Sequence, residues 1–251
     1  MPERELIEGR NPVLETLKAG RKVYRIWLQS DARGETMGEI RKLAAEQRVP
    51  IEEVEGKTLI GRSQTGYPQG VIAQVEAWKY ASVEQILARA EQQGEAPFLL
   101  LLDGLEDPQN FGSLIRTAET AGVHGIIITE HRAVGLTPAV ARASAGAVAY
   151  MPIARVTNLV RTMEELKEQG IWFAGADPQG VDFWKSPIDW RGPFGLIIGG
   201  EGKGIGRLVK EHCDALVRLP MRGKVSSLNA SVAGAILMYE AVRNRLIQVQ
   251  K

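Results

Sequence analysis

Three short stretches of the sequence place polar side chains where they could bind a ligand or promote a reaction. The first follows Asp103-Gly104 and reads EDPQNFGSLIRTAETAG, with Asn110 and Arg116 on a predicted helix. Asn110 stands at the helix start, where it could simply be an N-cap. Arg116 lies among apolar residues, and its permanently charged guanidinium needs a partner such as phosphate or a developing oxyanion. This stretch alone is equally compatible with a structural and a functional role.

The second stretch is GLIIGGEGKGIG, from Gly195 to Gly206, in which several glycines surround one carboxylate, Glu201. Glycine allows the backbone to approach a ligand closely, and open α/β sheets bind ligands at the carboxyl ends of their strands. The spacing lacks the GxxxxGK[ST] pattern of a phosphate loop and matches a dinucleotide fingerprint only weakly. We favour a ligand-binding loop here over a tight turn without further function.

The third stretch, LPMRGKVSSLNASVAGAILMYEAVRNR, begins with Leu219 at the end of a predicted strand. Ser226, Ser227, Asn229 and Ser231 crowd the start of the long apolar helix that follows. One such residue is enough for N-capping, by Ser227 or Asn229 for example, and four exceed that need. Backbone N–H groups at this helix start could hold a carboxylate or a phosphate.

The elements that must position these stretches form an α/β domain over residues 97–251. Its first strand, Phe98–Leu102, is continuously apolar, as expected of a strand buried on both faces of a parallel sheet. Further strands are expected at Gly125–Thr129, Ile171–Ala174, Leu196–Ile198 and Ala215–Leu219. Helices are expected at Asn110–Ala121, Pro138–Ala147, Asn158–Gln169, Arg207–His212 and Asn229–Ile247. This alternation predicts an open parallel sheet.

A smaller α/β domain is expected over residues 1–78, followed by a linker at 79–96. Its elements are a helix opened by Asn11-Pro12, a strand at Val23–Leu28, a helix at Met37–Ala45, and strands at Val49–Val54 and Gly70–Trp78. Within the linker, Ser82 and Gln85 fit a capping box at the start of a helix that runs to Gln93.

Composition narrows the class of protein. The 251 residues include no apolar run near the ~20 residues of a membrane-spanning helix, and the first residues lack a secretory signal, so we expect a cytoplasmic protein. One cysteine and three histidines without zinc-ligand spacing predict no metal site. Because the net charge is only +1, nucleic-acid binding would depend on local basic segments, Arg10–Arg25 or Lys203–Lys224.

Taken together, the three stretches resemble the SpoU (TrmH) family of RNA ribose 2′-O-methyltransferases, in the SPOUT superfamily. The family pattern has an asparagine and an arginine, then a glutamate in a glycine loop, then SLNxSVA; here these are Asn110 and Arg116, Glu201, and Ser227–Ala233. The stretches GRNPVLETL and YPQGV also resemble the subgroup that methylates a guanosine of 23S ribosomal RNA. Where that subgroup commonly has DPHN, this sequence has DPQN.

The resemblance implies a trefoil knot in the C-terminal domain that forms a pocket for S-adenosylmethionine, and an N-terminal domain similar to ribosomal RNA-binding proteins. It also implies a homodimer with the last helix in the interface. By position, the cofactor contacts would be Ala174, Gly175, Gly199, Leu219 and Leu228. The implied catalytic residues are Asn110, Arg116, Glu201, Ser227, Asn229 and Ser231.

We expect Arg116 to act electrostatically, because a guanidinium keeps its proton at neutral pH and is therefore a poor base. Asn110, Glu201 and Asn229 would orient Arg116 or the ribose. The best candidates for RNA phosphate contact are Arg10, Lys22 and Arg25 in the N-terminal domain. Two alternatives remain: a transfer RNA substrate, and a non-catalytic RNA-binding protein of ribosome assembly with a vestigial pocket.

Overall fold

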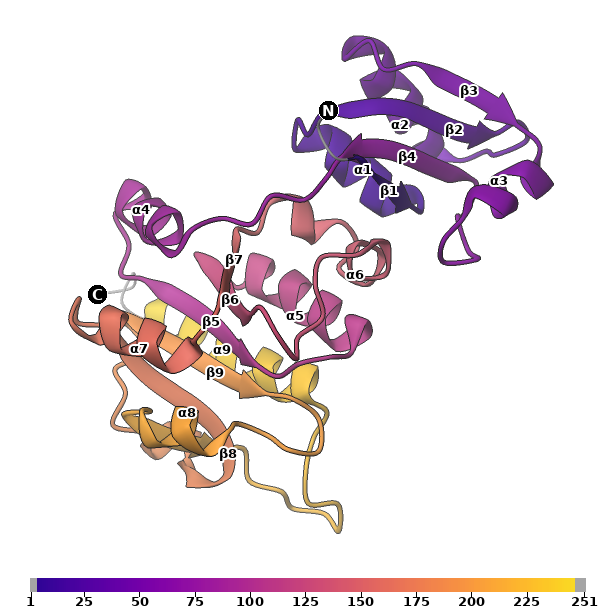
Figure 1. Cartoon of the computed structure of the whole chain (residues 1–251). Coiled ribbons are helices and arrows are strands. Elements are labelled where there is room, and N and C mark those ends of the chain that lie inside the picture. Colours follow the sequence, from indigo (N-terminus) through magenta and orange to yellow (C-terminus); the bar gives the residue numbers. More distant parts are fainter. Residues whose placement is uncertain (1–3, 247–251) are drawn as a thin grey trace. The chain divides into compact units, whose positions relative to one another are not determined.

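The computed structural model describes residues 4–246, which form two compact units (Figure 1). The first unit comprises residues 4–79 and 135–150, and the second comprises residues 80–134 and 151–246. The boundary at 79/80 lies one residue beyond the expected end of the N-terminal domain. Residues 135–150, which we expected within the C-terminal domain, pack with the first unit instead. The expected linker contains a regular helix, α4 (Val83–Gln93).

The first unit is built on a mixed four-stranded sheet with strand order β1-β4-β2-β3, in which only β2 and β3 are parallel. Its strands are β1 (Arg4–Glu8), β2 (Val23–Gln29), β3 (Ile51–Val54) and β4 (Val71–Glu76). Its helices are α1 (Arg10–Lys18), α2 (Glu35–Glu46), α3 (Gly56–Arg62), α6 (Pro138–Ala143) and the 3-10 turn η1 (Ala147–Ala149). Alternation along β2 sends Ile26 and Leu28 to the core under α1 and α2, and Trp27 to the opposite face with Leu59 of α3.

The second unit contains the expected open parallel sheet, with six strands in the order β10-β8-β9-β5-β6-β7. The strands are β5 (Phe98–Asp103), β6 (Gly125–Thr129), β7 (Ile153–Val156), β8 (Trp172–Asp182), β9 (Phe194–Gly199) and β10 (Ala215–Arg218). The central strands β5 and β9 are almost wholly buried, which explains their continuous apolar sequences. The α/β class predicted from the sequence is therefore confirmed for both units.

Helices cover both faces of this sheet (Figure 1). Besides α4 they are α5 (Pro108–Thr120), α7 (Leu159–Lys167), α8 (Arg207–Glu211) and α9 (Ala230–Leu246), with the 3-10 turn η2 (Phe183–Lys185). The helices α4, α7 and α8 pack on the face that presents Leu99 and Leu101, and α5 and α9 pack together on the other. The predicted capping box of Ser82 and Gln85 is present at α4.

The last helix is held at both of its described ends. Near its start, a Cβ on Gly234 would lie 2.6 Å from the Leu114 side chain, so glycine permits the close approach of α9 to α5. At its end, Arg245 donates hydrogen bonds to the carbonyl groups of Ala96, Trp190 and Gly192. The expected end of this helix, Ile247, lies outside the described residues. No helix within residues 4–246 is long and apolar enough to span a membrane.

Candidate cofactor pocket and active site

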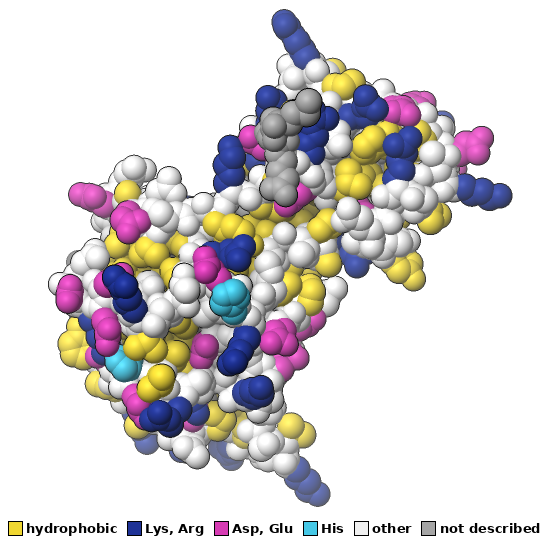
Figure 2. Space-filling model, in the orientation of Figure 1, with side chains coloured by type: hydrophobic (Ala, Val, Ile, Leu, Met, Phe, Trp, Pro, Cys, Tyr) yellow, Lys and Arg dark blue, Asp and Glu magenta, His cyan; other side chains and the backbone are white. Residues whose placement is uncertain are grey.

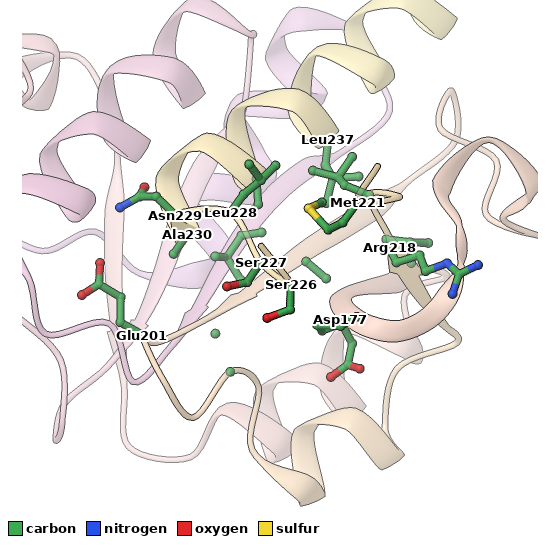
Figure 3. A pocket seen from close by; sticks show the side chains of 18 of the residues that line it. Asp177, Glu201, Arg218, Met221, Ser226, Ser227, Leu228, Asn229, Ala230 and Leu237 are labelled. Carbon is green, nitrogen blue, oxygen red and sulfur yellow. The ribbon is translucent and has the colours of Figure 1, made fainter. Parts of the chain in front are cut away.

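A cavity of about 790 Å³ opens where β9 and β10 end (Figure 3). Four segments line it: part of β8, the glycine loop after β9, the end of β10 with the residues that follow, and the approach to α9 with its first turns. These are the carboxyl ends of parallel strands, where open α/β sheets bind ligands. The second and third sequence stretches therefore meet at one site.

The glycine loop is shaped by contacts that only glycine allows. A Cβ on Gly199 would lie 2.0 Å from the carbonyl carbon of Gly204, and one on Gly200 would lie 2.0 Å from the carbonyl oxygen of Gly104. The backbone N–H of Gly200 donates to the carbonyl of Asp103 over 2.8 Å. These approaches bring the loop against the end of β5, so bare backbone lines the cavity.

A hydrogen bond joins the first stretch to the second. The Asn110 side chain is 5% exposed and donates through Nδ2 to Oε1 of Glu201, which lines the cavity. The N-cap of α5 is Asp107, whose carboxylate accepts from the N–H groups of Gln109 and Asn110. Asn110 is therefore not the cap of this helix, and its amide is used to position the carboxylate of Glu201.

The third stretch divides between the cavity and the helix. Ser226, Ser227, Leu228 and Asn229 line the cavity. The Oδ1 atom of Asn229 also accepts from the Ser231 N–H over 2.9 Å and from the Ser231 hydroxyl over 2.6 Å. Asn229 thus caps the start of α9, as one alternative predicted, and faces the cavity as well. Ser231 is directed to Asn229 and is not among the described residues that line the cavity.

Besides Asn110 and Ser231, three expected site residues lie outside the described lining of the cavity. Arg116 is on the exposed side of α5, and Ala174 and Gly175 are inside the sheet, paired with β9 and β10. We expected β8 to end near Ala174, but it continues to Asp182. The part of β8 that lines the cavity is consequently Ala176–Pro178, just beyond the expected pair.

Asp177 is a lining residue that the sequence stretches did not single out. Its side chain is 5% exposed, and its carboxylate lies 2.5 Å from Nζ of Lys210 on α8. Burial raises the pKa of this carboxyl, but hydrogen bonds from Lys210 and from the Gln179 N–H outweigh burial and leave the pKa below its ordinary value. The sequence feature that could have indicated this lining residue is the Asp-Pro pair directly after a buried apolar run.

The cavity suits S-adenosylmethionine in size and lining. Its volume is within the range of small-molecule sites, and its walls combine glycine backbone with the apolar side chains of Leu219, Met221 and Leu237. In Figure 3, Glu201 and Asn229 lie on one side of the cavity, and Asp177 and Arg218 lie on the other. Apolar walls and glycine backbone can hold an adenosine and a methionine moiety, and Glu201 and Asn229 place polar groups on one side of them.

The expected RNA-contact residues differ in their surroundings. Arg10 donates through Nε to the carbonyl of Gln69, and Arg25 lies 3.5 Å from the carboxylate of Glu52. Lys22 is exposed, with its Nζ 5.3 Å from the centre of the Tyr24 ring. Lys22 and Arg25 are therefore both exposed, and Arg10 is engaged within its own unit.

Comparison with known proteins identifies the family. Residues 97–239 match the model described as the SpoU rRNA Methylase family, and residues 6–81 match the model described as RNA 2′-O ribose methyltransferase substrate binding. The chain belongs to the SpoU methylase family. Asn110, Glu201 and the SLNASVA stretch all lie within the matched residues 97–239.

Relatives extend over almost the whole chain. YacO of Bacillus subtilis, assigned to the TrmH family of tRNA/rRNA methyltransferases, is 49% identical over 97% of both chains. The AdoMet complex of the SpoU methyltransferase AviRb from Streptomyces viridochromogenes has a TM-score of 0.81 at 28% identity, covering 97% of this chain and 91% of that one. The AdoMet-bound rRNA methyltransferase of Sinorhizobium meliloti gives 0.75 at 26% identity, covering 96% and 87%.

These comparisons confirm the class of reaction. The chain is an S-adenosylmethionine-dependent RNA ribose 2′-O-methyltransferase of the SpoU family, with an N-terminal substrate-binding domain. The cofactor expected from the sequence is likewise confirmed.

Proposed function

We propose that this SpoU methylase acts on a guanosine ribose of 23S ribosomal RNA. The support is the resemblance of GRNPVLETL and YPQGV to the subgroup with that substrate, and the similarity of both units to an rRNA methyltransferase of Sinorhizobium meliloti. A transfer RNA substrate is the second candidate, because the description of YacO includes both kinds of RNA.

The observation that carries the site assignment is the hydrogen bond between Asn110 and Glu201 beside the cavity. Bound S-adenosylmethionine supplies an activated methyl group, so the protein mainly aligns the 2′-hydroxyl oxygen and stabilises the charge that develops on it. Glu201, held by Asn110, would orient the ribose together with Asn229 and Ser227. Arg116 would stabilise the forming alkoxide or hold the neighbouring phosphate.

We infer a homodimer through α9. Val232, Ile236 and Tyr239 on this helix are 46%, 41% and 49% exposed, and such apolar exposure on one helix is typical of a subunit interface. Ile236→Glu should convert a dimer into monomers in sedimentation experiments. A wild-type protein that sediments as a monomer would contradict this inference.

We also infer the trefoil knot that the family resemblance implies. It is supported by the similarity of the whole chain to the SpoU methyltransferase AviRb.

Mapping of methylated riboses tests the substrate. Ribosomal and transfer RNA from a strain that lacks this chain should be compared with RNA from a strain complemented with the wild-type gene. Loss and recovery of one 2′-O-methylguanosine in 23S RNA would support the proposal. A site that appears only in transfer RNA would support the second candidate, and no altered site would favour the non-catalytic alternative.

A further inference from the structure

The first unit contains a second cavity, of about 520 Å³, on the side of its sheet that carries α3. Arg4 and Leu6 of β1, Trp27 of β2 and Arg62 of α3 line it. Gln64 and Gln74 contribute amide side chains, and the remaining lining residues also belong to the first unit. None of these residues belongs to the three sequence stretches.

Two guanidinium groups of the cavity are held against aromatic rings. The guanidinium carbon of Arg4 lies 4.4 Å from the centre of the Tyr24 ring, and that of Arg62 lies 4.8 Å from the centre of the Trp27 ring. Arg62 also lies 3.9 Å from Glu52, near the outer limit of an ion pair. Cation–π contact orients a guanidinium and leaves its N–H groups able to bind phosphate.

Hydrogen bonds hold the side chain of Gln74 and the backbone of Gln64. The Oε1 atom of Gln74 accepts from Arg4 over 3.5 Å. The backbone N–H of Gln64 donates to Glu8, whose carboxylate also accepts from Ser63 and Thr65. Burial raises the pKa of Glu8, but these hydrogen bonds outweigh it and leave the pKa below its ordinary value, so a charged carboxylate fixes this loop.

The floor of the cavity is apolar. Trp27 is 6% exposed, packs with Leu59 and Ile72, and donates through Nε1 to Glu52 over 2.9 Å, so its ring is fixed. Leu6 packs against the same cluster. The cavity therefore combines a rigid apolar floor, amides that can donate and accept, two cations and one acidic residue, Glu5, whose carboxylate accepts from the Trp78 N–H.

We propose that this cavity binds one unpaired nucleotide of the RNA substrate. This inference rests on the proposed function, since it takes the partner to be RNA. Arg4 and Arg62 would hold the phosphate, Gln64 and Gln74 would contact the base edge, and the apolar floor would receive the base. A single concave pocket fits a splayed-out nucleotide, whereas a duplex presents its 2′-hydroxyls and phosphates along an extended surface.

The wider surface fits an approaching RNA strand. Arg25 pairs in register with Gln74 on the adjacent strand β4, and Lys22 and Arg4 both lie over the Tyr24 ring. Figure 2 shows Lys and Arg side chains around hydrophobic side chains on this unit. The backbone of a strand whose nucleotide fills the cavity would therefore meet further cations.

Fluorescence anisotropy on the full chain tests this site. The probe is a labelled 12-nucleotide single-stranded RNA of mixed sequence, compared with the same strand annealed to its complement. Arg62→Ala should weaken single-strand binding about tenfold and reduce the slope of log K against log salt by about 0.7, the loss of one phosphate contact. Gln74→Leu should weaken binding several-fold with the slope unchanged, because it removes an amide and no charge.

Lys42→Ala is the matched control. Its side chain is 74% exposed on α2 of the same unit, 4.0 Å from Glu46, so it removes one cation away from the cavity. It should change affinity less than twofold. Unfolding curves of each variant show whether the fold is retained, and Arg62→Lys should keep the wild-type salt slope while losing part of the affinity.

Several outcomes would overturn the inference. The first is a wild-type protein that binds no single strand at low salt, and the second is one that binds the duplex more tightly than the single strand. The third is a pair of Arg62 and Gln74 variants that bind the single strand as tightly as the Lys42 control does. Methyl transfer to RNA is measured separately. An enzyme that methylates RNA equally well with and without Arg62 and Gln74 refutes this site and leaves the proposed function standing.

Discussion

Replacement of Gly199 by alanine tests the account of the cofactor pocket most directly. The new Cβ would lie 2.0 Å from the carbonyl carbon of Gly204 and 2.2 Å from the backbone nitrogen of Ile205. Ordinary contact between carbon atoms needs about 3.5 Å, so the backbone must move by about 1.5 Å. No flexible side chain can absorb this shift, because both contacts are with backbone atoms.

The cost should be that of overpacking, about 1–3 kcal/mol. If the glycine loop moves to relieve the clash, the pocket is distorted and the dissociation constant for S-adenosylmethionine rises about 5- to 160-fold. If the loop resists, the folded state carries the strain and Tm falls by about 2–4 °C per kcal/mol. Calorimetric titration with the cofactor measures the loss of cofactor affinity, and thermal unfolding of the cofactor-free protein measures the loss of stability.

Gly223→Ala is the control, since a Cβ on Gly223 meets nothing within 4 Å and its loop adjoins lining residue Met221. It should leave cofactor affinity and Tm near wild type. A Gly199 variant that keeps both the affinity and the Tm of the wild-type protein would refute the close approach of Gly199 to Gly204.

Four further predictions follow from the described contacts. Asn229→Ala should lower stability by about 1 kcal/mol through loss of the α9 cap, measured by urea unfolding, whereas Asn229→Asp keeps a capping oxygen and should lose less. Arg116→Ala should reduce turnover with saturating RNA about 10²–10³-fold and leave cofactor affinity unchanged; near-normal turnover would exclude an electrostatic role. The folded-state pKa of Asp177 is lowered from 3.8, so its stabilisation is present above that value and is lost as pH falls through the folded pKa. Asp177→Asn should therefore destabilise the protein at pH 6, and the loss should shrink progressively as the pH is lowered below 3.8. Charge reversal of Lys22 and Arg25 should raise KM for RNA without changing cofactor binding, and an unchanged KM would remove both from the RNA surface.

Sequence patterns predicted helices and strands best where a single physical property, such as continuous burial, determined the residues. Continuous burial identified β5, β6 and β9, and reciprocal side-chain chemistry identified the cap of α4. The pattern missed β1, whose sequence RELIE mixes charges with apolar residues, and β7, whose four residues include an arginine. Both pair with partners distant in sequence, and such pairing has no local signature.

The site was predicted in part for the same reason. Strand ends and glycines indicated where Glu201 and Leu219 would lie, since the carboxyl ends of parallel strands meet at one edge. The extension of β8 past Pro178 was not predictable from propensity, so the expected lining stopped at Gly175. Likewise, the hydrogen bond from Asn110 to Glu201 spans 91 positions and depends on the completed fold.

The anchoring of α9 determines when the cofactor pocket can form during synthesis of the chain. Arg245 attaches this helix to backbone that precedes β5 and β9, and residues up to Leu237 line the cofactor pocket. Because a ribosome releases a chain from its N-terminus, the pocket cannot be completed until nearly all of the described chain has emerged. A nascent chain or a truncated product that ends before α9 therefore cannot transfer a methyl group. Methyltransferase activity begins only after translation has reached α9.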